Sequence, residues 1–484
     1  MVYQNIDELK KNVAGVLTFT DDRIEILNQD KLKSTLIDDL VYSAVFSPDF
    51  GVREAACWLI RRTGAVLGIL SASIQNLYEA MGKNEASGFT VPAINLRGLT
   101  YDAAQAVFRA ALKGNVGPFI FEIARSEIGY TEQRPIEYTA VVTAAAIKTG
   151  YRGPIFLQGD HFQVSAKKFA TEPAKEIEAV SALIREAIEA GFYNIDIDSS
   201  TVVDLSKSDI KEQQRNNYTI AADLTALIRK AEPAGITVSV GGEIGEVGGK
   251  NSTVEEMQGF MDNYLEEMEK RGKGLKGISK ISVQTGTSHG GVVLPDGTIA
   301  KVKIDFDTLE KISRAAKEKY GMSGAVQHGA STLPDEAFDK FPKTETAEIH
   351  LATGFQNIIL DNPAFPAALR DELYTYVKTN LASERSEKDT EEQFIYKTRK
   401  KVFGPFKDAM WNLPPQIRTE IGRELEDKFS FLFEKLNVLN TRPVLDKFIH
   451  PPDVPLKVPA ALSGEAGSQK SGALPKTERY DEGE

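Results

Sequence analysis

Three of the five histidines stand just after short apolar segments that are typical of β-strands. They are His161, His289 and His328, and they lie far apart along the chain. One such histidine by itself is more often a helix cap or a hydrogen-bonded polar residue. Three from different strands can meet at one point, and an open-sided three-histidine arrangement is what catalytic zinc uses. We therefore expect these three side chains to hold one divalent ion.

Acidic residues occur beside one of these histidines and at the ends of other predicted strands. Asp160 directly precedes His161 and should point to another side of the rim, where it could act on substrate. Asp196 and Asp198 alternate on one strand, and Glu243 ends the next. Each acid alone could cap a helix or join an ion pair. Together they would make a strongly negative site unless a cation neutralises it, which is a second reason to expect a metal.

The elements that must position these residues follow a repeated strand–helix pattern that begins near Gly88. Eight short apolar runs predict strands over residues 91–95, 118–123, 155–158, 193–198, 237–243, 280–285, 324–327 and 357–360. Eight such units predict an α/β fold, a closed (β/α)8 TIM barrel, whose strand ends converge on one mouth. No G-x-G-x-x-G follows the first strand, which weakens a dinucleotide-binding alternative.

Additions flank the predicted barrel, which we assign to residues 88–382. Residues 1–87 are predicted as an N-terminal helical extension without a sheet, and residues 383–450 as a C-terminal helical extension. Residues 451–484 are rich in Pro, Gly, Ser and charge and are predicted to be disordered. The apolar helix faces need a partner, so we expect a homo-oligomer, either a dimer or a tetramer. His350, in a stretch predicted to be helical, and His450 are expected to be surface residues.

The overall composition restricts the classes of partner. The 484 residues carry a net charge of -11, which argues against nucleic acid or an anionic membrane because either would need a basic face. The single cysteine, Cys57, excludes an intrachain disulfide and a Cys-rich zinc module. The N-terminus lacks a signal pattern, and the apolar runs are too short to span a membrane. We expect a cytoplasmic protein.

Five stretches, in this order, resemble the class II (metal-dependent) fructose-bisphosphate aldolase family over residues 88–380. They are QGDHFQ (158–163), FYNIDIDSS (192–200), GGEIGEVGG (241–249), GTSHGG (286–291) and QHGAS (327–331), and Asn95 in PAINLRG also matches. The resemblance implies roles for individual residues. His161, His289 and His328 match zinc ligands, Asp160 the proton-exchanging aspartate, Glu243 an alternate metal ligand, Asp198 an acid behind the site, and Asn95, Gly290, Ser331 and Asp361 substrate-contacting positions.

The resemblance further implies a lyase of carbohydrate metabolism, glycolysis included. Its reaction would be zinc-dependent reversible aldol cleavage of a ketose (bis)phosphate, such as fructose 1,6-bisphosphate, through an enediolate. Zinc or another divalent ion is expected, and the family pattern also allows a monovalent cation. The chain departs from the family at Val293, where a basic residue is usual, and at Ile359, where Asn is usual. Two alternatives therefore remain: a metal-dependent isomerase, epimerase or hydrolase on a related substrate, and a non-catalytic barrel subunit.

Overall fold

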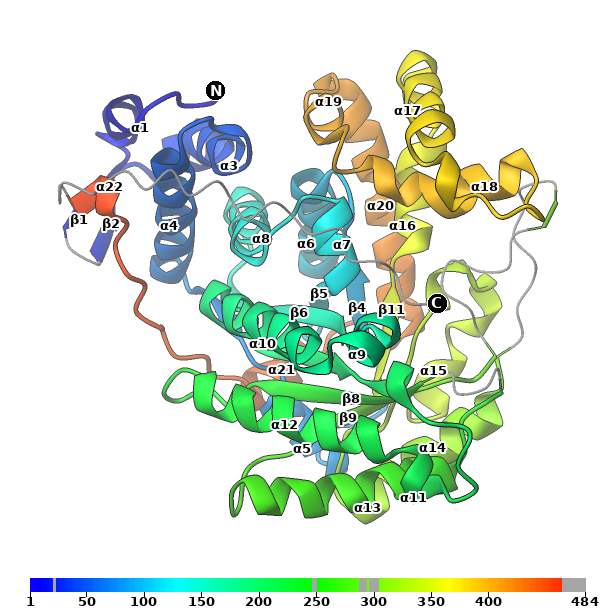
Figure 1. Ribbon diagram of the computed structural model, residues 1–484. Helices are drawn as coiled ribbons and strands as arrows, with labels where there is room; N and C mark the ends of the chain where they lie inside the picture. The colour runs from blue at the N-terminus through cyan, green and yellow to red at the C-terminus, as the bar shows by residue number, and fades with distance from the viewer. Residues whose placement is uncertain (21–22, 246–249, 287–293, 296–303, 464–484) are drawn as a thin grey trace.

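Eight parallel strands form a closed barrel in the computed structural model, which describes residues 1–20, 23–245, 250–286, 294–295 and 304–463 (Figure 1). The strands are β4 (Val91–Asn95), β5 (Ile120–Ala124), β6 (Gly153–Gln163), β7 (Asn194–Asp198), β8 (Ser239–Gly245), β9 (Lys280–Val283), β10 (Ala325–Gln327) and β11 (Glu348–Leu351). Pairing of β11 with β4 and of β6 with β7 closes the ring. The predicted (β/α)8 fold is confirmed.

Helices follow the strands and cover the outside of the barrel. They include α6 (Thr100–Gly114), α7 (Arg125–Tyr130), α8 (Pro135–Thr149), α9 (Ala166–Thr171), α10 (Pro173–Ala190), α11 (Ile210–Gln213), α12 (Arg215–Ala231), α13 (Val254–Arg271), α14 (Phe306–Tyr320), α15 (Lys340–Lys343), α16 (Thr353–Asp361) and α17 (Ala367–Asn380). Each long helix turns an apolar stripe to the sheet, as on α6, where Ala103, Val107 and Ala110 are buried. No helix of the described part combines the length and apolarity that a bilayer crossing needs.

The eighth strand differs from the prediction. Residues 357–360 belong to helix α16, and the strand is β11, whose residues Glu348 and His350 point into the barrel from alternate positions. Charged residues inside a strand broke the apolar run that predicted the other strands. His350 is therefore not on an exposed helix; it is buried, with 5% of its surface exposed.

The N-terminal extension contains strands as well as helices, in contrast to the prediction. A hairpin of β1 (Leu17–Thr20) and β2 (Arg23–Ile26) lies among α1 (Ile6–Val13), α3 (Ile37–Phe46) and α4 (Phe50–Val66), as Figure 1 shows. Strand β3 (Ile69–Ala72) pairs in parallel with the first half of β6, outside the barrel ring. Helix α5 (Gln75–Gly82) follows and brings Tyr78 to the barrel interior, where its hydroxyl donates to Glu348.

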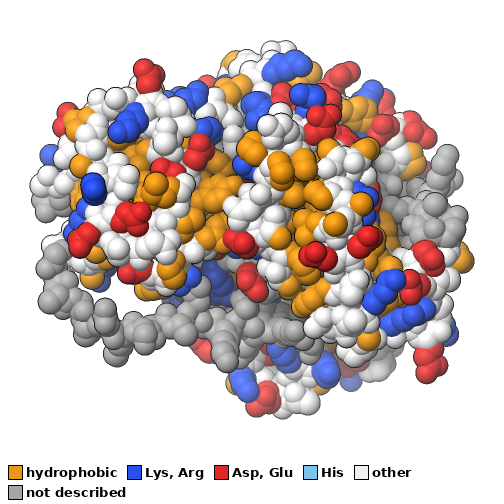
Figure 2. Space-filling view, turned by 90° about the horizontal axis from the view of Figure 1, so that it is seen from above, with side chains coloured by type: hydrophobic (Ala, Val, Ile, Leu, Met, Phe, Trp, Pro, Cys, Tyr) orange, Lys and Arg blue, Asp and Glu red, His pale blue; other side chains and the backbone are white. Residues whose placement is uncertain are grey.

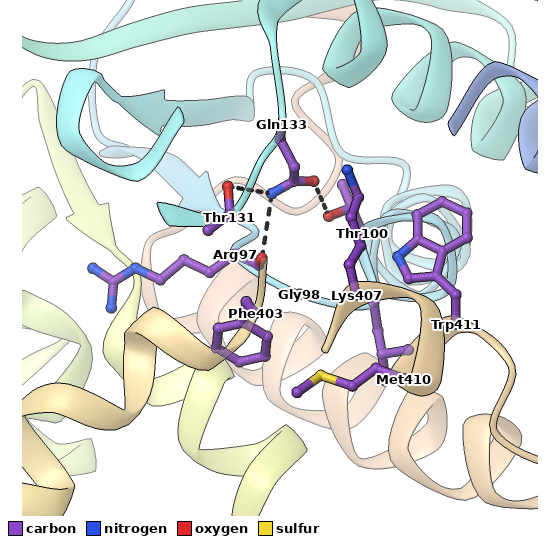
Figure 3. A pocket seen from close by; sticks show the side chains of 10 residues that line it. Arg97, Gly98, Thr100, Thr131, Gln133, Phe403, Lys407, Met410 and Trp411 are labelled. Atoms are coloured by element: carbon purple, nitrogen blue, oxygen red, sulfur yellow. Dashed lines mark hydrogen bonds between the residues drawn. The ribbon is translucent and has the colours of Figure 1, made fainter. Parts of the chain in front are cut away.

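The C-terminal extension docks on the loops that follow β4 and β5. It comprises α18 (Glu391–Thr398), α19 (Lys407–Trp411), α20 (Pro415–Lys435) and α21 (Arg442–Phe448). Figure 3 shows the docking point, where Gln133 donates to the carbonyl of Arg97 and the ring of Phe403 lies beside Gly98. A Cβ at Gly98 would lie 2.1 Å from that ring, so the close approach requires glycine.

Residues 451–463 are ordered against α4, although they were predicted to be disordered. We call residues 451–459 the strap; it leads to α22 (Ala460–Ser463), which contacts α4. Arg62 binds Asp453 of the strap through two nitrogens at 2.7 and 3.2 Å. The strap thus has specific partners that its composition did not indicate. The rest of the predicted tail, residues 464–484, lies outside the described residues.

Candidate active site

Strand β6 carries two functional candidates at adjacent positions. His161 has a φ of 39°, in the left-handed region, and the register of β6 with β7 shifts between Gly159 and Phe162. Such a bulge redirects side chains, and non-glycine residues in this region concentrate at functional sites. As a result Asp160 and His161 both reach the barrel mouth, with 3.9 Å between Asp160 Oδ1 and His161 Nε2.

His161 and His328 meet at this mouth. Their ring centroids lie 4.2 Å apart, and Asp160 Oδ1 lies 4.0 Å from His328 Nδ1. The potential ligand atoms of Asp160, His161 and His328 are all within 4.8 Å of one another. Two of the three predicted histidines are therefore together. His289 and Gly290 lie outside the described residues.

Two carboxylates contact the second ring nitrogen of His161. Its Nδ1 lies 3.2 Å from Asp198 Oδ2 and 3.2 Å from Glu243 Oε2. Burial alone would lower the pKa of His161, but Asp160 and Glu243 raise it well above its usual value. Burial and the charge of Asp198 raise the pKa of Glu243 to about 7. This negative environment favours a positive charge at the site, either a proton or a metal ion.

His350 belongs to the same cluster, and the sequence prediction missed it. Its ring centroid is 4.1 Å from that of His328, and its Nδ1 lies 3.1 Å from Asp160 Oδ1 and 3.0 Å from Glu122 Oε2. Its Nε2 lies 2.6 Å from Glu348 Oε1. Burial lowers the pKa of His350, but Glu122 and Asp160 outweigh burial and raise it. Both ring nitrogens thus face carboxylates, an environment that favours the protonated imidazole.

A charged layer lies directly below, inside the barrel, and we call it the lower layer: Gln158, Asp196, Lys280 and Glu348. Lys280 Nζ donates to Asp196 at 2.9 Å, to Glu348 at 2.6 Å and to Gln158 at 2.8 Å. All four residues are at most 5% exposed. Barrel interiors are usually filled by branched apolar side chains, so this layer is a substantial departure. Its lysine balances part of the acidic charge beneath the mouth.

The predicted substrate-contacting residues have different locations. Asn95, at the end of β4, donates to Glu127, and its Oδ1 is buried without a hydrogen-bond partner. Ser331 accepts from the backbone of Gly354, which follows β11. Asp361 is at the end of α16, not at a strand end, and it binds Arg399 at 2.6 Å. Asn95 and Ser331 border the mouth, whereas Asp361 is engaged by the C-terminal extension.

The two departures noted in the sequence have different outcomes. Ile359 lies buried in α16, so its comparison with a strand-eight Asn was placed on the wrong element. Val293 lies outside the described residues.

The donor set fits a divalent ion. Imidazole and carboxylate groups are the ligands that zinc takes, and a buried set of this kind without a cation would hold uncompensated negative charge. His161 and His328 would supply nitrogens and Asp160 lies within reach of the same ion, whereas Glu243 contacts the Nδ1 of His161 on the other side of the ring. A second contact fixes the orientation of one expected ligand: Nε2 of His328 lies 3.0 Å from the Ser282 hydroxyl, which leaves the other ring nitrogen for the ion.

Comparison with known proteins identifies the family of the chain. The family described as class II fructose-bisphosphate aldolase matches residues 75–412, more than two thirds of the chain. The chain belongs to the class II fructose-bisphosphate aldolase family. No curated protein matches it. The matched residues begin with α5 and include all eight barrel strands. They also include α18 and α19 of the C-terminal extension.

Solved structures resemble this class II aldolase family member at low sequence identity. A probable tagatose 6 phosphate kinase from Sinorhizobium meliloti 1021 is 19% identical, with a TM-score of 0.52, over 78% of this chain and 98% of that one. A fructose-bisphosphate aldolase from Campylobacter jejuni is also 19% identical, with a TM-score of 0.45, over 77% and 97%. The likeness to the Sinorhizobium meliloti structure supports the barrel fold.

Proposed function

We propose that this class II aldolase family member catalyses metal-dependent, reversible aldol cleavage of a ketose (bis)phosphate such as fructose 1,6-bisphosphate. The observation that carries the proposal is the meeting of His161, His328 and Asp160 within 4.8 Å at the barrel mouth. Family membership supplies the reaction class, and the donor set supplies the reason to expect a metal. Zinc is the ion that this combination of ligands favours.

The chain's own residues have separable tasks in this proposal. A divalent ion bound here would polarise the substrate carbonyl and so stabilise negative charge as the C–C bond breaks. Asp160 is placed beside both histidines and accepts the proton of the neighbouring hydroxyl during cleavage, then returns it during condensation. Asp198 and Glu243 orient His161 through its Nδ1, and His350 holds Asp160 from below.

Aldol cleavage can also proceed through a Schiff base on a lysine. The surroundings of Lys280, which lies inside the barrel, disfavour that chemistry. A Schiff base requires a neutral amine as the nucleophile. Burial alone lowers the pKa of Lys280, but Asp196 and Glu348 raise it above its usual value. Lys280 is therefore protonated and fully engaged by its three acceptors.

An assay over a small panel of ketose mono- and bisphosphates tests the proposed function. We expect stoichiometric release of an aldehyde fragment and a dihydroxyacetone-type fragment, with loss of turnover on chelation and recovery on adding zinc. Conversion of a substrate to an isomer without cleavage would assign the site to an isomerase or epimerase. Absence of turnover on the whole panel with metal bound would instead support the non-catalytic alternative.

A further inference from the structure

A small cavity that is partly open to solvent lies at the end of the barrel opposite the candidate active site. Its wall includes Tyr193, which immediately precedes β7, and the end of β3, which pairs with the first half of β6. The strap and α4 complete it. We call it the strap cavity; the polar residues lining it are Arg61, Arg62, Ser71, Thr143, Tyr193 and Asp453.

The two arginines of the strap cavity differ in their partners. Arg62 is bound to Asp453 of the strap by the paired contacts described above. Arg61, one residue earlier on α4, has no carboxylate within ion-pair distance among the described residues. Burial and the neighbouring charge of Arg62 both lower the pKa of Arg61, with burial the larger effect. A partly buried guanidinium without a counter-ion is unfavourable, because its lost hydration is not replaced.

The hydroxyl of Ser71 lies near the guanidinium of Arg61. A Cβ built at Gly191 would lie 3.3 Å from Arg61 Nη2 and 2.7 Å from Ser71 Oγ, so both atoms point to the bare backbone of that glycine. Gly191 has a φ of 96°, which also favours glycine here. Tyr193, two residues on, also lines the strap cavity. The guanidinium of Arg61 and the hydroxyl of Ser71 therefore lie close together in the wall of the cavity, packed against the backbone of Gly191.

We propose that the strap cavity binds a phosphate-type oxyanion, either free or as the phosphate group of a small phosphomonoester. A guanidinium beside a hydroxyl donor matches the acceptors of a phosphate, and arginine is well suited to them. The anion would provide the counter-charge that Arg61 lacks. Because Asp453 is already bound to Arg62, the strap closes the cavity without occupying the Arg61 side. The proposal does not depend on the proposed aldol reaction.

Calorimetric titration with inorganic phosphate, in a buffer without oxyanions, tests the proposal on the full chain. Arg61→Met keeps the apolar stem and removes the charge, and we expect it to weaken phosphate binding by tenfold or more. Arg423→Met is the matched control, since Arg423 is exposed on α20 and forms an ion pair with Glu420. It should bind phosphate as the unchanged protein does. Any phosphate bound at the metal centre remains in both variants, so the difference between them isolates the strap cavity.

A thermal melt without phosphate would show whether Arg61→Met is folded. If it is not, Ser71→Ala provides a second variant, and we expect its dissociation constant for phosphate to be several-fold larger than that of the unchanged protein. Repeating the titration with glycerol phosphate separates the two sources: tighter binding of the ester favours an organic phosphate, and tighter binding of the inorganic ion favours free phosphate. Superimposable titrations for the unchanged protein and the variant that folds would overturn the proposal, as would undetectable phosphate binding in the unchanged protein.

Discussion

Asp160 is the residue on which the proposed proton transfer depends. Its Oδ1 lies 3.1 Å from Nδ1 of His350. The same oxygen lies 3.9 Å from Nε2 of His161 and 4.0 Å from Nδ1 of His328. It therefore stands between the expected metal ligands and the charged layer below. A carboxylate in this position can exchange a proton with a substrate hydroxyl.

Asp160→Asn should lower kcat by ~10²–10⁴, the usual loss when a general acid or base is removed. Metal content should stay as in the unchanged protein, because the histidine ligands remain. Asp361→Asn is the matched control, since Asp361 binds Arg399 away from the mouth. Steady-state cleavage assays with metal analysis measure both. Equal kcat values for the two variants would remove Asp160 from the mechanism.

His350→Gln should reduce kcat by ~10–100-fold with little change in KM, the range typical of residues that orient a functional group from behind. Glutamine can donate to either Asp160 or Glu348, whereas the protonated ring donates to both. His450, exposed after α21, gives the matched control His450→Gln. A rise in KM alone would mean that His350 contacts substrate and does not act as a positioning residue.

Several of these residues could be found from the sequence, and His350 could not. His161 and His328 follow apolar runs, so their strand-end positions are visible in the pattern. His350 lies within Glu348–Leu351, where two inward-facing polar residues remove the apolar signal. Its role depends on carboxylates more than a hundred residues away, such as Asp160 and Glu122.

At the scale of elements, the barrel interior explains both the success and the failure of the strand prediction. Strands β4 and β5 are buried on both sides and read as apolar or near-apolar segments. Strand β11 contributes to the lower layer, so charge pairing replaces apolar packing there. The N-terminal hairpin was missed because β1 and β2 are only four residues each and largely exposed.

Lys280→Met should destabilise the protein by ~3–5 kcal/mol, the usual result of removing one partner of a buried charge pair. Asp196 and Glu348 would lose the cation that lies between them. Lys343→Met is the control, because Lys343 forms an exposed ion pair with Asp339 that should contribute only ~0–1 kcal/mol. Urea unfolding at neutral pH measures both. A loss for Lys280→Met no larger than for the control would contradict the account of the lower layer.

The same layer predicts how stability depends on pH. Burial raises the pKa of Glu348, but Lys280 and His350 outweigh it and lower the pKa to about 2, from a usual 4.5. A depressed carboxyl pKa contributes stability that is present above the usual pKa and lost as pH falls through the folded value. The contribution of Glu348 should therefore decline from about pH 4.5 towards pH 2. In Glu348→Gln, unfolding measurements over this window should give a flatter profile; an unchanged slope would contradict the assignment.

At the scale of the whole molecule, the extensions complete the barrel on opposite sides. The strap and α22 lie along α4, while α20 packs on α6, α18 packs on α17 and α19 lies beside the loop that follows β4. Seen from above, apolar side chains gather near the middle of the molecular face, among charged ones (Figure 2). An apolar area of this kind is typical of a contact with another protein surface.

A homo-oligomer, either a dimer or a tetramer, therefore remains our prediction for the protein in solution. Sedimentation equilibrium over a range of concentrations would measure it. A mass of two or four chains of 53.2 kDa is the expected result. A single-chain mass at the highest concentration would contradict the prediction and leave the apolar face for another partner.

Metal analysis of purified protein, together with turnover, for the unchanged chain and His328→Ala is the most direct test of the central claim. His328 is 6% exposed and lies 4.2 Å, ring to ring, from His161, so its imidazole is expected to be a ligand. The account predicts about one divalent ion per chain, and loss of both ion and turnover in the variant but not in His450→Ala. Full turnover by a metal-free His328→Ala variant would contradict it.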